Sequence, residues 1–350
     1  MKIAMLVSGG VDSSVALRLV KNQGHDVTAF YLKIWLEDEL AYLGECPWQE
    51  DLDYAQKVCD QAGVELKVVS LQQAYHEKIV AYTIKTIKEG RTPNPDVLCN
   101  TMIKFGAFYD EVGKEYDAIA TGHYAQVVKR DGIFYLHQTP DPIKDQTYFL
   151  SQLTPAQLSR VMFPIGEYKK SEVRELATLY DLPNKNRKDS QGLCFLGKIK
   201  FRDFVKHHVG TNPGQLVEYE TGKVWGEHEG FWFYTVGQRQ GIGLSHGPWY
   251  VVKTDPETNT VFISSHYKEL EKTRDTFSIG HCNWFAGSAP HQTTLKVKLR
   301  HGPQEYTCSF SNNGDGTFFI TLPEDDQGLA AGQFAVFYDN GLCLGSGVIL

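Results

Sequence analysis

Apolar residues follow two different patterns along the chain, and the first dominates up to about residue 200. There, short apolar runs predict buried strands at residues 3–7, 26–32, 64–71 and 117–121. Apolar positions that recur every three to four residues predict helices at residues 12–23, 49–62, 75–89 and 99–113. Strands and helices in alternation form a parallel sheet with helices on both faces. We therefore predict a Rossmann-like α/β domain over residues 1–200.

The second pattern, after about residue 210, consists of short alternating runs separated by turn residues. It predicts a meander of strands at residues 293–300, 305–311 and 318–322. Asn340-Gly341, a dipeptide typical of two-residue hairpin turns, predicts a hairpin of residues 334–338 and 342–349. Regular turns between short strands are typical of small barrels and sandwiches. We expect a small, mainly β central domain over residues 201–275 and a C-terminal β-barrel over residues 276–350.

Composition narrows the class of protein. The chain has 350 residues, of which 42% are hydrophobic and 22% charged, as in globular proteins with more than one domain. It has no apolar run of the roughly 18 residues that a membrane helix needs, and it starts in a strand without a signal-peptide pattern, so we expect a cytoplasmic protein. The seven cysteines are scattered without a CxxC pair, which favours free thiols and predicts no metal site.

Charge is unevenly distributed along the chain. The net charge of −7 taken alone disfavours a nucleic-acid partner. However, residues 185–208 hold seven Lys or Arg and two acids, a local net charge of +5, where a polyanion could bind. Residues 37–53 hold seven acids and no Lys or Arg. This acidic stretch is either a solvated helix face or a surface for a partner or a lid over a nucleotide.

The clearest motif is SGGVDSS, Ser8 to Ser14, between the first predicted strand and helix. Its glycines let backbone N–H groups approach an anion, and the helix dipole places about half a positive charge there. No Lys follows at the Walker A position. An ordinary strand-to-helix turn, with Asp12 or Ser13 as N-cap, is the alternative, and the residues alone leave both open.

SGGVDSS resembles the pyrophosphatase loop, or PP-loop, of the adenine-nucleotide α-hydrolase-like superfamily, whose members adenylate a substrate and release pyrophosphate. The resemblance implies ATP with Mg²⁺ as a substrate. It implies a nucleotide site formed by Leu6, Val7, Ser8, Gly9, Gly10, Val11, Asp12 and Ser13. The acceptor stays open, because amidating synthetases, ligases and tRNA-modifying enzymes all use this loop.

Two cysteines are candidates for chemistry. Cys99 lies in NPDVLCN, residues 94–100; with Asp96 as N-cap it takes the third helical position, where the dipole favours a thiolate. A carboxylate raises the pKa of a nearby thiol, so proton transfer suits Asp96 better. Alternatively, Asp96 only caps the helix and Cys99 packs as a small hydrophobe. Cys194 lies in the basic segment, whose positive charge makes a thiol more reactive. We expect packing roles for Cys46, Cys59, Cys282, Cys308 and Cys343.

Taken together, these segments resemble the tRNA-specific 2-thiouridylase family over nearly the whole chain. The resemblance also rests on GLCFLG around Cys194, TGHYA at 121–125, KDQTYFL at 144–150, TVGQRQGIG at 235–243 and GQFAVFY at 332–338. It implies ATP-dependent thiolation of the wobble uridine, position 34, in tRNAs for Lys, Glu and Gln. It further implies a monomer with a tRNA-contacting barrel, supplied with sulfur by a sulfur-relay protein or a cysteine desulfurase.

The resemblance also assigns roles to residues. It places a persulfide on Cys194, a nucleophilic or resolving role on Cys99 and an acid/base role on Asp96. It implies adenosine contacts by Leu32 and Gly122. It implies tRNA contacts by Asn94, Pro95, Asp96, His123, Lys144, Asp145, Gln146, Arg300, His301 and Gln333. The family often has Tyr where this chain has His301. For His123, an ordinary hydrogen-bonded loop histidine is the alternative.

Two routes of sulfur transfer and two other functions stay open. If Cys99 attacks the persulfide, a Cys99–Cys194 disulfide forms and must be reduced before the next turnover; alternatively, free hydrosulfide attacks directly. A small-molecule ATP-dependent synthetase would explain the loop but neither cysteine nor the β domains. An RNA-binding module with an idle nucleotide site would leave the intact loop unexplained. Because some tRNA thiolases bind an iron–sulfur cluster through CxxC, which is missing here, we expect no cluster.

Overall fold

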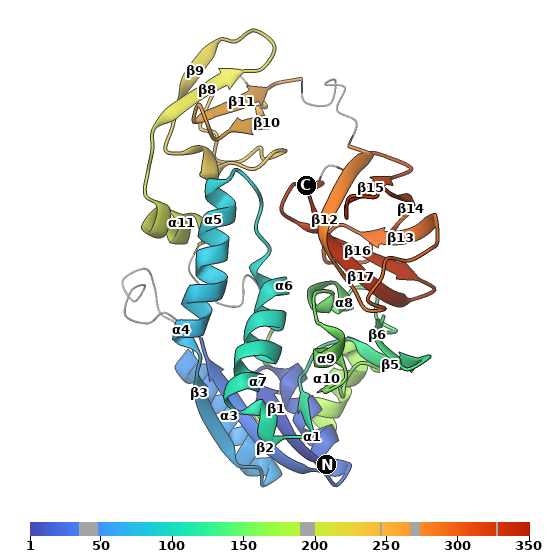
Figure 1. Cartoon of the computed structure of the whole chain (residues 1–350). Helices are drawn as coiled ribbons and strands as arrows, with labels where there is room; N and C mark the ends of the chain where they lie inside the picture. The colour runs from blue at the N-terminus through green and yellow to red at the C-terminus, as the bar shows by residue number, and fades with distance from the viewer. Residues whose placement is uncertain (35–47, 190–199, 246, 267–273, 327) are drawn as a thin grey trace.

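The computed structural model describes residues 1–34, 48–189, 200–245, 247–266, 274–326 and 328–350. Three parts follow one another along the chain: an α/β domain, a small sheet of strands β8 to β11, and a barrel that begins with β12 (Figure 1). The predicted α/β fold followed by β structure and a barrel is therefore confirmed. Within the described ranges, each helix is too short or too polar to cross a bilayer.

The α/β domain is built on five parallel strands in the order β3-β2-β1-β4-β7. They are β1 (Lys2–Val7), β2 (Asp26–Lys33), β3 (Leu66–Ser70), β4 (Ala118–Ala120) and β7 (Val161–Met162). The first four correspond to the predicted strands, whereas the short β7 was not predicted. Because β1 connects to β2 on one side and lies beside β4 on the other, the strand order reverses at β1. In open α/β sheets, ligands bind at the carboxyl ends of the strands at such a point.

Helices cover both faces of this sheet because successive residues of β1 point to opposite sides. Ile3 and Met5 share one core with helices α1, α3 and α10, and Ala4 and Leu6 share the other with the helices between β3 and β4. The main helices are α1 (Val11–Asn22), α3 (Trp48–Ala62), α4 (Gln72–Tyr75), α5 (Ala81–Lys88), α6 (Pro95–Cys99), α7 (Phe108–Glu111), α8 (Thr147–Leu150), α9 (Pro155–Leu158), α10 (Lys170–Leu179) and α11 (Phe201–Val209). Two π-helical segments, η2 (His76–Val80) and η3 (Asn100–Ala107), and the 3₁₀ turn η4 (Gly113–Glu115) continue them.

The central part is a four-stranded sheet in the order β10-β11-β8-β9. Its strands are β8 (Gly214–Glu218), β9 (Val224–His228), β10 (Tyr250–Asp255) and β11 (Thr260–Ser264), with the 3₁₀ turn η5 (Phe231–Phe233) between β9 and β10. Strands β8 and β11 pair in parallel, and the other two pairs are antiparallel. Aromatic and β-branched residues form its own small core, which includes Phe231, Trp249 and Val251.

The C-terminal part is a closed six-stranded barrel, in which β12 pairs with both β15 and β17. Its strands are β12 (Thr276–Trp284), β13 (Thr294–Lys298), β14 (Tyr306–Asn312), β15 (Phe318–Thr321), β16 (Phe334–Asp339) and β17 (Leu342–Ile349). The predicted meander and hairpin are both present. Asn340 and Gly341 have φ values of 48° and 80°, as a type I′ turn requires.

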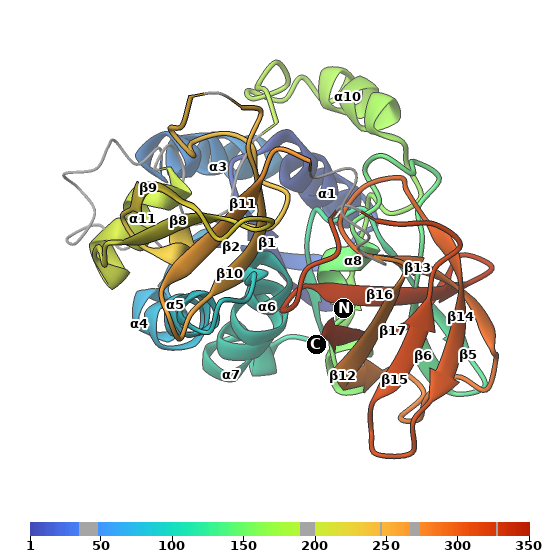
Figure 2. The same ribbon diagram turned by 90° about the horizontal axis from the view of Figure 1, so that it is seen from above.

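The barrel and the α/β domain are more closely joined than the sequence predicts. A hairpin of the first domain, β5 (Gln126–Arg130) and β6 (Ile133–His137), adds to barrel strand β17 through Leu136 and His137. Figure 2 shows β5 and β6 beside the barrel strands. In addition, barrel residues Phe334 and Tyr338 belong to the same hydrophobic cluster as the core of the first domain. One hydrophobic cluster therefore spans the boundary between the two parts, in addition to the separate core inside the barrel.

Candidate active site

The predicted phosphate loop joins the end of β1 to α1. Gly10 is the N-cap of α1 and offers no side chain to the first N–H groups of the helix. The hydroxyls of Ser13 and Ser14 donate to the Gly10 carbonyl at 3.0 and 2.9 Å. The alternative, in which Asp12 or Ser13 caps the helix, is wrong, because both lie inside it. The first turn of α1 therefore presents N–H groups that could donate hydrogen bonds to a phosphate.

Glycines bring neighbouring segments against this loop. A Cβ atom on Gly122, just after β4, would lie 2.6 Å from the Ser13 nitrogen, so the two chain segments touch at the point where the strand order reverses. Gly9 has a φ of +71° and lies against the backbone of Asp51 in α3. Leu32, near the carboxyl end of β2, belongs to the same edge of the sheet. The structure thus places Gly122 and Leu32 at the edge that carries the loop.

An ionic network that the sequence did not reveal surrounds Asp12. Its carboxylate accepts from Lys170 of α10 at 2.7 and 2.9 Å and from the Tyr124 hydroxyl at 2.8 Å. Lys170 also pairs with Asp189 at 2.7 Å, and Arg174 and Lys144 pair with the same carboxylate at 2.6 and 2.7 Å. Burial raises the pKa of Asp189, but the hydrogen bonds from Lys144 and Lys170 outweigh it and lower that pKa to about 2. Asp189 therefore stays charged.

Arg187 of the basic segment and Asn184, which directly precedes that segment, also contact the loop. The Asn184 amide donates to the Gly9 carbonyl at 2.8 Å and to the Ser14 hydroxyl at 2.9 Å. The Arg187 guanidinium donates to the same carbonyl at 3.2 Å and forms an ion pair with Asp51. Burial raises the pKa of Asp51 against the lowering effect of Arg187. Two described acids of the stretch 37–53, Glu50 and Asp51, are thus paired with Arg187 of the basic segment beside the loop. Residues 37–47 lie outside the described residues.

Helix α6 begins two residues earlier than predicted. Its N-cap is Asn94, whose side chain accepts from the Val97 N–H at 3.3 Å, and Pro95 takes the first helical position, where a fixed φ and a missing N–H are tolerated. Asp96 is therefore not the cap, and Cys99 is the fifth helical residue instead of the third. Cys99 is only 2% exposed. Both residues remain on one short helix that leads directly into the π-helical segment η3.

The remaining cysteines divide as follows. Cys194 and Cys46 lie outside the described residues. Cys59, Cys308 and Cys343 are buried in hydrophobic clusters, which confirms their predicted packing roles, and Cys282 packs partly buried against the barrel core. Burial raises the pKa of Cys59 to about 12 and that of Cys308 to about 11. No group of three metal-ligating side chains occurs in the described part of the chain.

His123 is held in one tautomer. Its Nδ1 lies 2.7 Å from the Thr121 hydroxyl, and its Nε2 lies 3.4 Å from the Lys104 ammonium. Because an ammonium can only donate, Nε2 accepts and Nδ1 carries the proton. Burial and the Lys104 charge lower the pKa of His123 well below its ordinary value. His123 is therefore a neutral, hydrogen-bonded histidine just after β4, in agreement with the alternative interpretation. A contact between His123 and tRNA stays a prediction.

Several predicted tRNA-binding residues already have partners inside the protein. The Asp145 carboxylate is fully buried, where it accepts from Lys298 and Thr147 at 2.8 Å each. The Gln146 side-chain carbonyl accepts from the Tyr124 N–H at 2.9 Å. These contacts orient the segment internally, and RNA binding by Lys144, Asp145 and Gln146 stays a prediction.

In the barrel, Arg300 and His301 lie next to each other in the segment that follows β13. Arg300 forms a two-pronged pair with Asp326 at 2.8 and 2.7 Å, although its side chain stays 49% exposed. The His301 ring stacks on Phe149 with centroids 4.8 Å apart. An aromatic stack thus exists at the position where the family often has Tyr. Gln333 contacts the loop that precedes α6.

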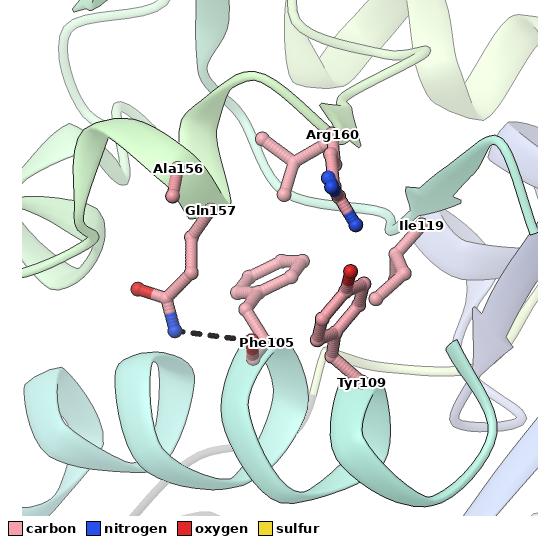
Figure 3. A pocket seen from close by; sticks show the side chains of 7 residues that line it. Phe105, Tyr109, Ile119, Ala156, Gln157 and Arg160 are labelled. Atoms are coloured by element: carbon pink, nitrogen blue, oxygen red, sulfur yellow. Dashed lines mark hydrogen bonds between the residues drawn. The ribbon is translucent and has the colours of Figure 1, made fainter. Parts of the chain in front are cut away.

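A pocket of ≈ 150 Å³ opens elsewhere on the α/β domain (Figure 3). It is lined by Phe105, Tyr109, Ile119, Ala156, Gln157, Arg160 and Val161. Gln157 closes one side by donating to the carbonyls of Thr101 and Phe105 at 2.8 and 3.0 Å. None of the predicted site residues lines this pocket, so it is not the predicted nucleotide site.

Together, the reversed strand order, the glycine-rich loop and the cationic surroundings define an α/β nucleotide-binding domain with a cysteine-bearing helix in the same fold. Family models match three consecutive stretches: a "tRNA methyl transferase HUP domain" at 1–198, a "tRNA methyl transferase PRC-barrel domain" at 202–265 and an "Aminomethyltransferase beta-barrel domain" at 274–349.

Curated relatives match the chain from end to end. The "tRNA-specific 2-thiouridylase MnmA" of Parabacteroides distasonis is 44% identical over 356 residues, with 100% of this chain and 99% of the relative covered. "tRNA-specific 2-thiouridylase MnmA 1" of Bacteroides thetaiotaomicron is 45% identical over 355 residues, with the same coverage. The chain belongs to the tRNA-specific 2-thiouridylase family.

Solved structures resemble the chain more distantly. The U34-tRNA thiolase NcsA from Methanococcus maripaludis aligns with a TM-score of 0.35 at 19% identity, covering 55% of this chain and 62% of that one. A 4-thiouridine synthetase in complex with RNA aligns with a TM-score of 0.36 at 16% identity, covering 57% of this chain and 45% of that one. The family membership rests on the full-length relatives and the family models.

Proposed function

We propose that this protein is an ATP-dependent tRNA sulfurtransferase that converts the wobble uridine, position 34, to 2-thiouridine. The observation that carries this proposal is the identity of 44–45% to tRNA-specific 2-thiouridylases over the whole chain. The matched region covers the whole chain and therefore spans both the phosphate loop and the helix that bears Asp96 and Cys99. A small-molecule synthetase would have no use for the barrel or for that helix. Two of the matching family models are described as domains of tRNA methyl transferases, but the full-length relatives are named as 2-thiouridylases.

The first step activates C2 of the uridine. Its carbonyl oxygen attacks the α-phosphate of ATP, the bond to pyrophosphate breaks, and an O-adenylated uridine forms. The loop from Ser8 to Ser14 would hold the departing pyrophosphate through backbone N–H groups, with Lys170 and Arg187 nearby as positive charges. Leu32 and Gly122 would contact the adenosine. Because a stacked anticodon base is inaccessible, Asn94, Pro95 and Asp96 would border an extruded base.

The second step transfers sulfur. Cys194 carries a persulfide, and Cys99 attacks its inner sulfur, which gives a Cys99–Cys194 disulfide and hydrosulfide. Hydrosulfide then attacks C2, and AMP leaves with the original oxygen. An external reductant, such as a thiol, must reopen the disulfide before the next turnover. Asp96 acts as the acid/base group. In the alternative route, free hydrosulfide from the donor attacks C2 directly.

Mg²⁺ would enter as part of the ATP substrate. Mg²⁺ commonly binds one or two carboxylates together with the phosphates and keeps several waters. The Asp12 carboxylate beside the loop is already bonded to Lys170 and Tyr124. The described residues therefore fit an ion held mainly by the phosphates, and the metal would stabilise the charge of the leaving pyrophosphate.

The partners follow from the same proposal. tRNAs for Lys, Glu and Gln are the substrates, and the sulfur donor is a sulfur-relay protein or a cysteine desulfurase. The positive segment 185–208 and the barrel positions Arg300, His301 and Gln333 would face the tRNA. We also propose a cytoplasmic monomer, without an iron–sulfur cluster, and domain boundaries near residues 200 and 275, close to where the family models end and begin.

The decisive experiment incubates the purified protein with ATP, Mg²⁺, a persulfide donor and unmodified tRNA, and analyses the nucleosides by mass spectrometry. We expect 2-thiouridine and AMP in equal amounts. Cys99→Ser and Cys194→Ser should abolish the product with the persulfide donor, whereas Cys308→Ser, a matched buried cysteine, should retain it. Methylated uridine, or wild-type rates in both active-site variants, would show the proposal to be wrong.

Formation of the disulfide separates the two routes, because hydrosulfide is the species that attacks C2 in both. If Cys99 first attacks the persulfide, non-reducing peptide mapping after one turnover should detect a Cys99–Cys194 disulfide. If free hydrosulfide from the donor attacks C2 directly, no such disulfide should form. In both routes, the Cys194→Ser variant should regain product formation when sulfide replaces the persulfide donor.

A further inference from the structure

We propose that Gln333 and Tyr148 form a clasp that positions the active-site helix α6 through Asn94. Gln333 comes from the barrel, and Tyr148 bonds to barrel backbone. The proposal rests on the proposed function only in assigning the chemistry to Asp96 and Cys99. It makes Gln333 a positioning residue in the free protein, in addition to the tRNA contact that the family resemblance implies.

Asn94 is the residue on which the clasp acts. Its side-chain oxygen accepts from the Val97 N–H and so caps α6. Its side-chain nitrogen donates to the Gln333 carbonyl oxygen at 3.0 Å and to the Tyr148 hydroxyl at 3.3 Å. The orientation of the Asn94 amide is thereby set from outside the helix, and this orientation decides whether the oxygen faces the helix.

The side-chain nitrogen of Gln333 bonds to the same loop. Its nitrogen donates to the carbonyl of Pro93 at 3.0 Å and to that of Thr92 at 3.5 Å. Its own backbone is held in the barrel, because the Ile349 N–H donates to the Gln333 carbonyl at 2.8 Å. The side chain therefore joins β17 to three consecutive residues before α6.

The backbone next to Gln333 approaches the same loop closely. The Thr92 N–H donates to the Ala331 carbonyl at 2.8 Å. Gly332 has a φ of +92°, and a Cβ atom there would lie 2.7 Å from the Thr92 carbonyl oxygen. A side chain at residue 332 would thus separate the barrel from the loop, so the contact is built into the backbone as well as into Gln333.

Tyr148 is the second arm of the clasp. It is 1% exposed, and its hydroxyl donates toward the barrel carbonyls of Phe334 at 3.2 Å and Leu299 at 3.3 Å. Leu299 directly precedes Arg300, so the clasp is adjacent to the predicted tRNA-binding positions of the barrel. An RNA group that formed hydrogen bonds with the Gln333 side-chain amide would compete with Asn94 for that amide and would change the start of α6.

Amide hydrogen exchange of the free protein tests the clasp without tRNA. In Gln333→Ala and Tyr148→Phe, the amides of residues 94 and 96–99 should exchange about five- to tenfold faster, the range expected for the loss of one hydrogen bond. Asn94→Asp keeps the capping oxygen but cannot donate, so it should exchange faster too. Gln292→Ala, an exposed barrel variant, should match the wild type. Unchanged exchange in both Gln333→Ala and Tyr148→Phe would overturn the proposal.

Kinetics separate positioning from RNA contact. For Tyr148→Phe we expect kcat for 2-thiouridine formation at saturating tRNA to fall about tenfold, while the tRNA Kd stays within about twofold of the wild-type value. A weaker Kd with an unchanged kcat in Tyr148→Phe would overturn the proposal. If the protein formed no 2-thiouridine at all, the proposed function would fail, but the exchange result would still decide whether the clasp exists.

Discussion

Lys298 of barrel strand β13 donates to Asp145 of the first domain at 2.8 Å, and both side chains are almost fully removed from solvent, at 2% and 0% exposure. The Thr147 hydroxyl donates to the same carboxylate oxygen. A buried charge that loses its partner is strongly unfavourable. This pair therefore links the stability of the first domain to the attachment of the barrel.

Lys298→Met should lower the free energy of unfolding by about 3 kcal/mol or more, because it leaves the Asp145 carboxylate buried without its cation. Lys296→Met, on the same strand but exposed, should change it by less than about 0.5 kcal/mol. Denaturant unfolding measures both. Equal changes in the two variants would contradict a special role for the buried pair.

Gly122→Ala should weaken ATP binding at least about tenfold, because the added methyl group would lie 2.6 Å from the Ser13 nitrogen and push the phosphate loop away from β4. Gly226→Ala is the matched control, since its Cβ would meet Leu244 at an ordinary 3.5 Å. Calorimetric titration with ATP gives both dissociation constants. An unchanged constant for Gly122→Ala would mean that the loop tolerates the displacement.

Asp189 should contribute to the pH dependence of stability. Its pKa is lowered from 3.8 to about 2 in the folded protein, so its contribution is present above pH 3.8 and is lost as the pH falls toward 2. Within that window, the free energy of unfolding of the wild type should fall more steeply than that of Asp189→Asn. Superimposable slopes in acid denaturation would contradict the paired state of Asp189.

The buried structural cysteines should resist alkylation. A thiol reacts as the thiolate, and burial raises the pKa of Cys59 to about 12 and that of Cys308 to about 11. Near pH 8, iodoacetamide should therefore leave both unmodified in the folded protein and modify both after denaturation. Peptide mass spectrometry reads the result. Rapid labelling of either residue in the folded state would show local opening at that position.

The sequence predicted those parts of the site that have local signals. Glycines and serines between a strand and a helix indicate a phosphate loop, and Asn340-Gly341 indicates a hairpin, because each pattern works within a few residues. The start of α6 was predicted two residues late, since Asn94 and Asp96 are both good capping residues and proline at the first helical position decided between them.

Contacts between distant segments had no such signal. Lys170 and Asn184 approach the phosphate loop from more than 150 residues away, and Gln333 reaches Asn94 across 239 residues. Side-chain chemistry alone cannot indicate these partners, because many lysines and amides in the chain would serve equally well. The hairpin β5–β6 was missed for the same reason: its place is decided by pairing with β17, at the far end of the chain.

The shared hydrophobic cluster has a consequence for biosynthesis. Translation completes the segment with Cys99 long before it produces Gln333 and strand β17, and domains generally begin to fold as they emerge. Until Gln333 and strand β17 leave the ribosome, the start of α6 lacks its barrel contacts, and the nucleotide domain lacks part of its core. A chain truncated before Gln333 would therefore carry the phosphate loop, but its helix α6 would start without the barrel contacts.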